Sequence, residues 1–349
     1  MIFIITSMKA WMIFKSSDLS VENYPLELSE LPKPEPKSGE VLIKISTCAV
    51  CHTEIDEIEG RTPPESFPVI PGHQVVGIIE KSNTTRKDIS IGDRVGVAWI
   101  YTACGTCDLC LSGQENLCQN FRATGRDVHG GYAEYMVADE NYVYKIPSIF
   151  SDIEAAPLLC AGAIGYRSLS LCNIKDGDAL ALTGFGASAH LVLKLVHYIF
   201  PHSDIFVFAR SEKERKFALE LGAKWAGDTT ERPPVLMNAI IDTTPVWKPI
   251  LYALEFLKPG GRLVINAIRK ENLDQEMLTE LDYSKHLWME KEIKSVANVT
   301  RKDVENFLDL AAKIPIKPNT EIYSFNRANE AILDIKNRKI KGAKVLLMQ

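Results

Sequence analysis

Four cysteines lie close together in the segment YTACGTCDLCLSGQENLC, residues 101–118. They are Cys104, Cys107, Cys110 and Cys118, half of the eight cysteines in the chain. Their spacing, with glycines between them that permit tight turns, is typical of a closed structural zinc site with four thiolate ligands. An iron–sulfur cluster uses similar spacings, and free thiols in a loop are the plainest alternative. Because four sulfurs leave no position for a substrate, we expect this loop to be structural.

The cellular compartment decides between a metal site and disulfides. The N-terminal MIFIITSMKAW lacks the basic start and the long apolar run of a signal peptide, and Met8 is an alternative start. The most apolar window, residues 179–200, contains Lys194, two histidines and a glycine turn, so we expect no membrane span. We therefore predict a cytoplasmic protein, in which clustered cysteines more often bind metal than form disulfides.

Size and charge narrow the class of protein further. The chain has 349 residues, 46% of them hydrophobic and 24% charged, with a formal net charge of −5. This length suggests about two domains, and the composition is that of a globular enzyme. No basic stripe is present, so we expect neither nucleic acid nor a membrane surface as a partner.

The periodicity of the apolar residues changes near residue 152. Before it, alternating runs broken by proline and glycine predict a β-rich domain. After it, strands and helices alternate, which predicts a doubly wound parallel sheet. The expected strands lie at 40–47, 73–82 and 133–140 in the first part and at 178–184, 204–209, 238–244 and 262–267 in the second. A final segment from about residue 315 adds a strand, a helix and a last strand.

The segment TGFGASAH, residues 183–190, follows a predicted strand and opens a predicted helix. In that context Gly184 would permit the tight turn, and Gly186 would let a pyrophosphate approach the helix N-terminus beside Ala187 and Ser188. Ala189 replaces the third glycine of the dinucleotide-binding fingerprint, where only close packing is needed. We predict a nicotinamide cofactor here, with an ordinary strand–helix turn as the alternative.

The end of the second strand of this domain bears on the type of cofactor. NAD sites usually carry an acidic residue there, but this chain has Arg210 and Ser211. An arginine can pair with the 2′-phosphate of NADP through charge-assisted hydrogen bonds. We therefore favour NADP(H), with NAD(H) possible and Arg210 then a solvated side chain.

Three distant segments carry further metal-binding residue types, namely Cys51 in 48–56, His73 in 71–77 and Cys160 in 156–166. Each alone is weak, because a single cysteine is more often packed than ligating. Together with the four-cysteine loop and the nucleotide turn, however, the chain resembles the zinc-dependent alcohol dehydrogenases of the medium-chain dehydrogenase/reductase superfamily. The resemblance covers nearly the whole chain, and the motifs fall in the family's order.

The resemblance implies two zinc ions per chain, one structural and one catalytic. Cys51, His73 and Cys160 match the family's three ligands of the catalytic zinc. Two thiolates and an imidazole leave one position open, and a Lewis acid there can bind an alcohol and polarise an aldehyde. Thr53 matches the hydroxyl that takes the alcohol proton, after which hydride passes to the nicotinamide.

Other positions take their roles from the same resemblance. Glu54 matches the carboxylate that orients the ligand histidine, and His52 falls where a basic residue contacts the cofactor pyrophosphate. Ile58, Trp99 and Ile164 are apolar candidates for the substrate pocket. They suggest an aliphatic or aromatic alcohol or aldehyde, primary or secondary, as the small-molecule substrate.

The chain also departs from the family's pattern. Gln74 stands beside the ligand histidine where glutamate is common, which puts ligand exchange at the metal in doubt. Asp56, which we assign a catalytic role, stands where some members have a relay histidine. Ala343 replaces an arginine that binds the pyrophosphate in some members, and Lys341 or Lys344 is a candidate to compensate.

The implied architecture has two domains. Residues 1–154 and 301–349 would form a GroES-like catalytic domain with both zinc sites, and residues 155–300 a Rossmann dinucleotide-binding domain. We expect the active site in the cleft between them. Family habit indicates a homodimer or homotetramer.

Two other functions stay open. A polyol or amino-alcohol dehydrogenase of the same superfamily usually has a glutamate among the ligands of the catalytic metal, so Cys160 argues against it. A non-catalytic nucleotide-binding redox sensor would need no open metal site, and the ligand set with Thr53 argues against it.

Overall fold

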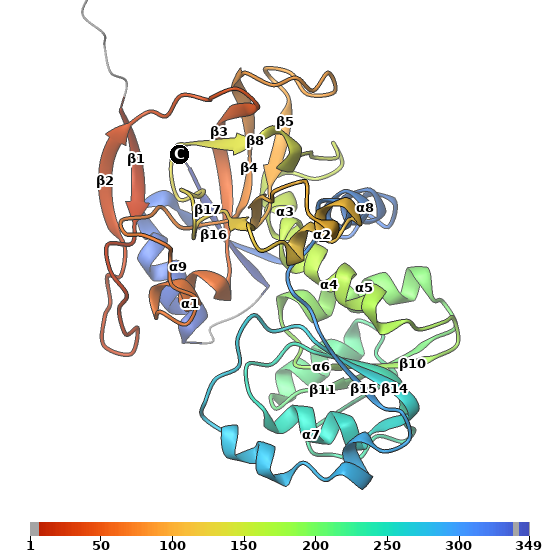
Figure 1. The fold of residues 1–349 in the computed structure, drawn as a ribbon. Coiled ribbons are helices and arrows are strands. Elements are labelled where there is room, and N and C mark those ends of the chain that lie inside the picture. The colour runs from red at the N-terminus through yellow and green to blue at the C-terminus, as the bar shows by residue number, and fades with distance from the viewer. Residues whose placement is uncertain (1–6, 338–341, 349) are drawn as a thin grey trace, which may run out of the picture. The chain divides into compact units, whose positions relative to one another are not determined.

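The computed structural model describes residues 7–337 and 342–348. The chain divides into two compact units (Figure 1), the first containing residues up to Cys160 and from Asn298 onward, the second residues 161–297. The division falls after Cys160 and before Asn298, where the sequence suggested 154 and 301. We call these the catalytic unit and the nucleotide unit.

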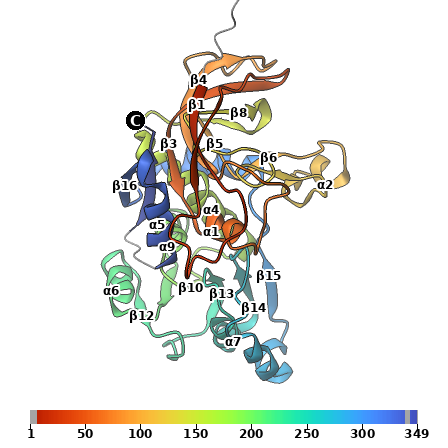
Figure 2. The same cartoon turned by 90° about the vertical axis from the view of Figure 1, so that its left-hand side faces the viewer.

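The catalytic unit is built on a seven-stranded sheet with strand order β16-β17-β3-β4-β5-β9, in which β8 also pairs with β3. The two longest strands, β3 and β4, pair in the middle of this sheet (Figure 2). Its strands are β3 (Glu40–Val50), β4 (Gln74–Ser82), β5 (Arg94–Val97), β8 (Tyr135–Asp139), β9 (Val143–Lys145), β16 (Thr320–Ser324) and β17 (Ala343–Leu347).

Smaller elements complete this unit. Two separate two-stranded sheets consist of β1 (Ser7–Met12) with β2 (Glu27–Pro32) and of β6 (Ile100–Thr102) with β7 (Arg122–Ala123). The α-helices are α1 (His52–Ile58), α2 (Asp108–Leu111), α3 (Asp152–Ala155), α8 (Arg301–Lys313) and α9 (Ala328–Lys336). Short 3-10 turns are η1 (Glu115–Leu117), η2 (Glu140–Tyr142), η3 (Ala156–Leu159) and η6 (Phe325–Arg327).

The C-terminal segment supplies two strands at one side of the catalytic sheet, β16 at the edge and β17 next to it. β17 pairs antiparallel with β3, with Lys344 opposite Val50 and Leu347 opposite Thr47. On its other side, β3 pairs antiparallel with β4, with Ala49 opposite Gln74. The metal-binding residue types at 51 and 73 therefore follow and precede two neighbouring strands, which brings them to one end of the sheet.

The nucleotide unit contains a six-stranded sheet in which every neighbouring pair is parallel. Its order is β12-β11-β10-β13-β14-β15, which is the 3-2-1-4-5-6 order of a doubly wound dinucleotide-binding fold. The strands are β10 (Ala179–Thr183), β11 (Asp204–Phe208), β12 (Trp225–Gly227), β13 (Met237–Asp242), β14 (Leu257–Ile265) and β15 (Glu292–Ser295). The predicted fold class, a β-rich domain with a doubly wound parallel sheet, is confirmed.

Helices connect these parallel strands. They are α4 (Ala161–Cys172), α5 (Ala187–Ile199), α6 (Glu212–Glu220) and α7 (Lys248–Glu255), followed by the turns η4 (Gln275–Glu280) and η5 (Tyr283–Leu287). β10 is buried along its whole length, as a strand covered by helices on both faces must be. Two glutamates in the first turn of α6 favour its N-terminus through the helix dipole.

The described residues contain no single helix that is long and apolar enough to cross a membrane. One bent helix pair, Asp152–Leu159 with Ala161–Cys172, meets the length and composition criterion.

Candidate active site

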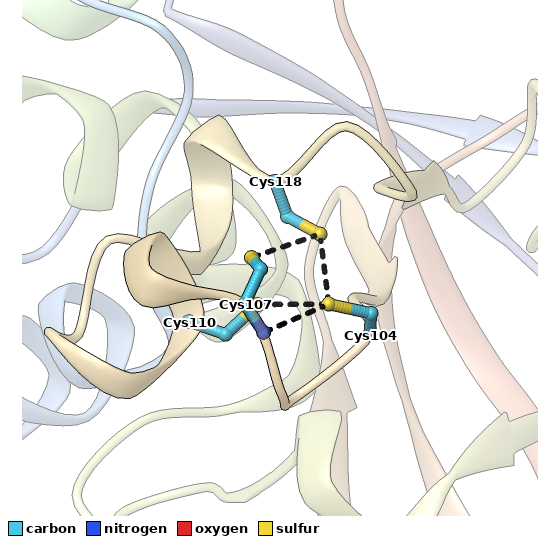
Figure 3. Close-up of side chains that lie close together, drawn as sticks. All are labelled: Cys104, Cys107, Cys110 and Cys118. Atoms are coloured by element: carbon cyan, nitrogen blue, oxygen red, sulfur yellow. Dashed lines mark hydrogen bonds between the residues drawn. The ribbon is translucent and has the colours of Figure 1, made fainter.

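The four-cysteine loop forms a compact cage in the catalytic unit (Figure 3). The Sγ atom of Cys104 lies 3.5 Å from that of Cys118 and 3.8 Å from that of Cys110, and the Sγ atoms of Cys107 and Cys118 are 3.9 Å apart. Gly105, at φ +70°, makes one of the turns that fold the loop back on itself.

These sulfur separations fit zinc. Four thiolates at about 2.3 Å from a tetrahedral centre lie roughly 3.8 Å from one another. A disulfide would require about 2.05 Å, and all four cysteines are free thiols. The backbone N–H of Cys107 also points to the Sγ of Cys104, 3.4 Å away, which supports a thiolate there. That contact contributes, after the N–H of Thr106, to lowering the pKa of Cys104 to about 5.

A second group, Cys51, His73 and Cys160, also lies in the catalytic unit. One ligand atom from each residue lies within 4.8 Å of the other two. Cys51 precedes the first residue of α1, His73 precedes β4, and Cys160 follows η3 at the end of the unit. The structure thus brings together three side chains whose positions in the sequence are far apart.

His73 is held by a tightly packed turn. It is 1% exposed, and Gly72 before it adopts φ +95°. A Cβ atom on Gly72 would lie 2.3 Å from the ring of Tyr132, so only glycine fits between this ring and the backbone. His73 Nδ1 lies 2.6 Å from Glu54 Oε1, whereas its Nε2 is buried without a hydrogen-bond partner. An orphaned imidazole nitrogen beside two thiols is what a metal ligand looks like before the metal binds.

Glu54 serves two of the three candidate ligands. Its Oε2 accepts a hydrogen bond of 2.7 Å from the backbone N–H of Cys51, closing the first turn of α1 as a capping box does. Its Oε1 holds the His73 ring. The sequence assigned Glu54 the histidine contact and did not anticipate the contact with Cys51.

The two cysteines differ in acidity. A hydrogen bond from Cys160 is the largest cause that lowers the pKa of Cys51 well below its ordinary value, and His73 adds to it. The same hydrogen bond and burial raise the pKa of Cys160 well above its ordinary value. Cys51 is thus the first of the pair to become the thiolate that a metal requires.

The other predicted residues of α1 take different positions. The Oγ1 atom of Thr53 lies 3.5 Å from Cys51 Sγ, and this threonine is almost fully buried. His52 is exposed. The carboxylate of Asp56 is buried and accepts a hydrogen bond of 2.6 Å from Arg61 Nε, so its acceptor capacity is partly used. Gln74 is buried at the start of β4.

The three predicted pocket residues lie in different surroundings. Ile58 is fully buried in the hydrophobic core of the catalytic unit. Trp99 is half-buried there, its ring 5.1 Å from that of Phe121. Ile164 is half-buried on α4 of the nucleotide unit.

The predicted nucleotide turn joins β10 to α5. Gly184 has φ +78°, and a Cβ atom there would lie 2.9 Å from Thr243 Oγ1. Gly186 is the N-cap of α5 and has open space where a Cβ atom would be. Ala187 and Ser188 form the first turn, and Ala189 is fully buried against the sheet.

Arg210 and Ser211 follow the end of β11, and both are exposed. Ser211 is the N-cap of α6, but its side chain makes no capping hydrogen bond. Among the candidates to replace a pyrophosphate arginine, Lys344 is buried, with its Nζ 2.6 Å from Glu321 Oε2 and 2.8 Å from the Tyr323 hydroxyl. This ammonium is already paired inside the catalytic unit, so it is not available to compensate for Ala343. Lys341 lies outside the described residues.

Two buried groups escaped sequence prediction. Asp242, at the end of β13, accepts hydrogen bonds from Thr183 Oγ1 and Lys270 Nζ, both at 2.5 Å, and ties together the strand ends beside the nucleotide turn. Glu57 is fully buried one helical turn after Thr53. The acid-rich run that contains Glu57, residues 54–59, reads as an exposed helix, so no sequence signal marked it.

Comparisons with known proteins identify the family of the chain. A family model, "Alcohol dehydrogenase GroES-like domain", matches residues 37–148. The chain is 39% identical to the Mycobacterium tuberculosis protein described as "Probable alcohol dehydrogenase AdhA", covering 98% of both chains. It is 33% identical to an alcohol dehydrogenase of Geobacillus stearothermophilus, covering 93% of this chain and 96% of that one.

Solved structures share the fold. The Helicobacter pylori enzyme CAD, complexed with NADP(H), has a TM-score of 0.85 at 23% identity and covers 98% of each chain. The alcohol dehydrogenase of Aeropyrum pernix has a TM-score of 0.85 at 22% identity, covering 97% of this chain and all of that one. Fold and site together define a medium-chain dehydrogenase/reductase. Within that superfamily, the chain belongs to the zinc-dependent alcohol dehydrogenase family and is an oxidoreductase that acts on alcohols.

Proposed function

We propose that this chain is a zinc-dependent, NADP(H)-preferring alcohol dehydrogenase that interconverts primary or secondary alcohols with aldehydes or ketones. One observation carries the proposal: the ligand atoms of Cys51, His73 and Cys160 converge within 4.8 Å, beside the hydroxyl of Thr53. Three ligands leave a tetrahedral metal with one open position, as catalytic zinc sites require.

The chain's own residues divide the work. Bound zinc would supply a Lewis acid that favours ionisation of the alcohol. Thr53 Oγ1, 3.5 Å from Cys51 Sγ, would accept the alcohol proton and hold it during hydride transfer. Glu54 holds the His73 ring through Nδ1, so that Nε2 would be available to bind the metal. The cage of Cys104, Cys107, Cys110 and Cys118 would hold a second zinc that only stabilises its loop.

The cofactor would lie on the β10–α5 turn. Gly184 and Gly186 leave room for a pyrophosphate at the N-terminus of α5, where backbone N–H groups favour anions. The strand end carries Arg210 and Ser211 and no acid, which favours the 2′-phosphate of NADP. The H. pylori structure was solved with NADP(H), whereas a similar acetophenone reductase from Geotrichum candidum was solved with NAD.

A fluorescence titration of the zinc-loaded protein with NADPH and with NADH tests the cofactor assignment. We expect tighter binding of NADPH, and we expect Arg210→Ala to weaken NADPH binding about 10-fold or more while leaving NADH unchanged. Lys216→Ala removes an exposed positive charge from α6 and serves as the matched control. Equal binding of the two cofactors by the wild-type protein would refute the NADP(H) preference.

Steady-state turnover tests the reaction itself. Because cells generally keep NADPH reduced, we expect reduction of aliphatic and aromatic aldehydes to be the faster direction. Loss of activity on zinc removal and its return with added zinc would support the metal assignment. An enzyme that keeps full activity without the catalytic zinc would contradict it.

We also propose that two chains associate through the edge of the nucleotide sheet. β15 ends the strand order, so one side of its backbone is unpaired within the described chain. Ile293 on this strand and Trp288 and Met289 just before it are exposed hydrophobic residues. Ile293→Lys should convert the native oligomer to smaller species in size-exclusion chromatography with light scattering.

A further inference from the structure

Arg215 on α6 holds the backbone at the end of β11. Its Nη1 atom donates a hydrogen bond of 2.8 Å to the carbonyl oxygen of Ala209 and one of 2.9 Å to that of Arg210. β11 ends at Phe208, so both carbonyl groups belong to the turn that leads into α6. Because the donor is a cation, each contact is stronger than a hydrogen bond between neutral groups. The helix thus fixes the piece of backbone that carries Arg210.

The same guanidinium group reaches the neighbouring strand end. Arg215 Nη1 lies 3.6 Å from Oδ2 of Asp228, the residue that follows β12. The backbone also joins the two strand ends, since the N–H of Ala209 donates to the carbonyl oxygen of Gly227 at 3.0 Å. The Arg215 side chain is 26% exposed and that of Asp228 is 50% exposed. An acid therefore stands at this edge of the sheet, after β12 and not after β11, and a cation is paired with it.

These groups lie where the adenosine half of a dinucleotide belongs. β10, β11 and β12 are neighbouring parallel strands, and a doubly wound fold binds its ligand outside the carboxyl ends of such strands. Arg210 follows β11 and Asp228 follows β12, so both residues stand at that edge. A phosphate monoester carries roughly two negative charges at neutral pH. Arg210 would attract a 2′-phosphate there, and an unpaired Asp228 would repel it.

We propose that Arg215 is the positioning residue that makes this strand end selective for the 2′-phosphate of NADP(H). This inference rests on the proposed function and deepens its cofactor assignment. Arg210 would touch the phosphate, whereas Arg215 sets the backbone that carries Arg210 and compensates the charge of Asp228. Without Arg215 the turn loses two hydrogen bonds and the acid loses its cation. NADPH then binds more weakly, and NADH, which lacks the 2′-phosphate, does not.

A purely structural role for Arg215 predicts a different result. A partly exposed ion pair at 3.6 Å contributes little to stability, and the two carbonyl contacts would stabilise the turn whichever cofactor is bound. Loss of a structural residue would lower the thermal stability, or weaken both cofactors by the same factor. Only the proposed role changes the ratio of the two affinities.

The test measures binding and is independent of turnover. Dissociation constants of NADPH and NADH are measured by fluorescence titration with the zinc-loaded full chain. Those of 2′,5′-ADP and 5′-AMP are measured by calorimetry, because these two fragments differ only in the 2′-phosphate and contain no nicotinamide. We expect Arg215→Met to weaken NADPH and 2′,5′-ADP by about 5–20-fold and to leave NADH and 5′-AMP within about twofold.

Three further variants separate the two parts of the role. Asp228→Asn removes the acid and should tighten 2′,5′-ADP by about two- to fivefold, and in that background Arg215→Met should weaken binding less than it does alone. Arg215→Lys keeps the charge but lacks the forked donors, so it should restore part of the NADPH affinity. Lys224→Met breaks an exposed ion pair of 2.6 Å with Asp204, at the amino end of β11. This matched control should leave all four dissociation constants unchanged.

Each outcome decides. Loss of the NADPH preference in Arg215→Met supports the inference. A preference that survives in Arg215→Met, an equal weakening of all four ligands, or lower thermal stability with an unchanged ratio overturns this inference alone. If Arg215→Met does not fold, Asp228→Asn decides, since tighter binding of 2′,5′-ADP but not of 5′-AMP supports the inference and unchanged binding overturns it. Equal binding of NADPH and NADH by the wild-type protein overturns the proposed cofactor preference and this inference with it.

Discussion

The Oε1 atom of Glu54 lies 2.6 Å from Nδ1 of His73, and both side chains are sealed from solvent. The second oxygen of the same carboxylate accepts the backbone N–H of Cys51. One side chain therefore orients two of the three candidate metal ligands, and it selects the tautomer of His73 that leaves Nε2 free.

Glu54→Gln should weaken the catalytic zinc site by about 10–100-fold, because an amide offers one acceptor oxygen where the carboxylate uses two. The measurement is zinc retention against a graded series of chelator concentrations. The zinc in the four-cysteine cage serves as the internal control, since its retention should not change. Wild-type retention at both sites would contradict the role assigned to Glu54.

Zinc content should separate the two metal sites. We expect two zinc ions per wild-type chain, one for each ligand group, and one in either Cys51→Ser or Cys110→Ser. Cys110→Ser should lose about 4 kcal/mol or more of unfolding free energy with its structural metal. Cys51→Ser should lose activity instead, with a smaller loss of stability. Cys172→Ser, a change in a buried thiol outside both groups, is the control and should retain both ions.

The two glycines of the nucleotide turn should respond differently to alanine. Gly184→Ala places a side chain at φ +78° and a Cβ atom 2.9 Å from Thr243 Oγ1, so it should cost about 1–3 kcal/mol of stability. Gly186→Ala meets no atom within 4 Å and should fold normally, yet it should weaken NADPH binding by crowding the pyrophosphate. Thermal unfolding and cofactor titration of both variants distinguish strain from cofactor contact. Normal NADPH binding by Gly186→Ala would argue against a pyrophosphate at this turn.

His190 should make stability fall with acidity. Burial lowers its pKa to about 4, from 6.5 in an exposed histidine. Between these values the unfolded chain binds a proton that the folded chain does not, so stability is complete above pH 6.5 and declines as the pH falls toward 4. The full effect is about 3 kcal/mol. Urea unfolding at pH 7, 6 and 5 should show a shallower decline for His190→Gln.

His202→Gln is the control for that experiment. His202 is exposed, and its hydrogen bond with Asp176 raises its pKa, so its contribution has the opposite sign and is lost as the pH rises. A decline that is equally steep in the wild type and in His190→Gln would remove His190 as its cause.

The sequence predicts the nucleotide unit well because its central strands are buried on both faces. β10 and β11 read as largely apolar runs. β15, with the sequence EIKS, carries no such signal, since only its pairing with β14 makes it a strand. β12, a strand of three residues, is missed for the same reason.

At the site, the spacing of the cysteine and histidine motifs predicted the metal ligands, whereas the residues around Glu57 in the sequence did not predict its burial. The convergence of Cys51, His73 and Cys160 follows from motifs in a known order. The burial of Glu57 does not, because it depends on how α1 packs in the folded unit. Its acidic neighbours made Glu57 look like a surface residue, and only its burial singles it out.

The pairing of β17 with β3 has a consequence for the order of events during protein synthesis. The catalytic sheet includes residues 343–347, so the end of β3 that leads into Cys51 gains its neighbour β17 only after the entire nucleotide unit has left the ribosome. Long-range strand pairing is also the slow step of sheet formation. We therefore expect the nucleotide unit to fold on the nascent chain before β16 and β17 complete the catalytic sheet.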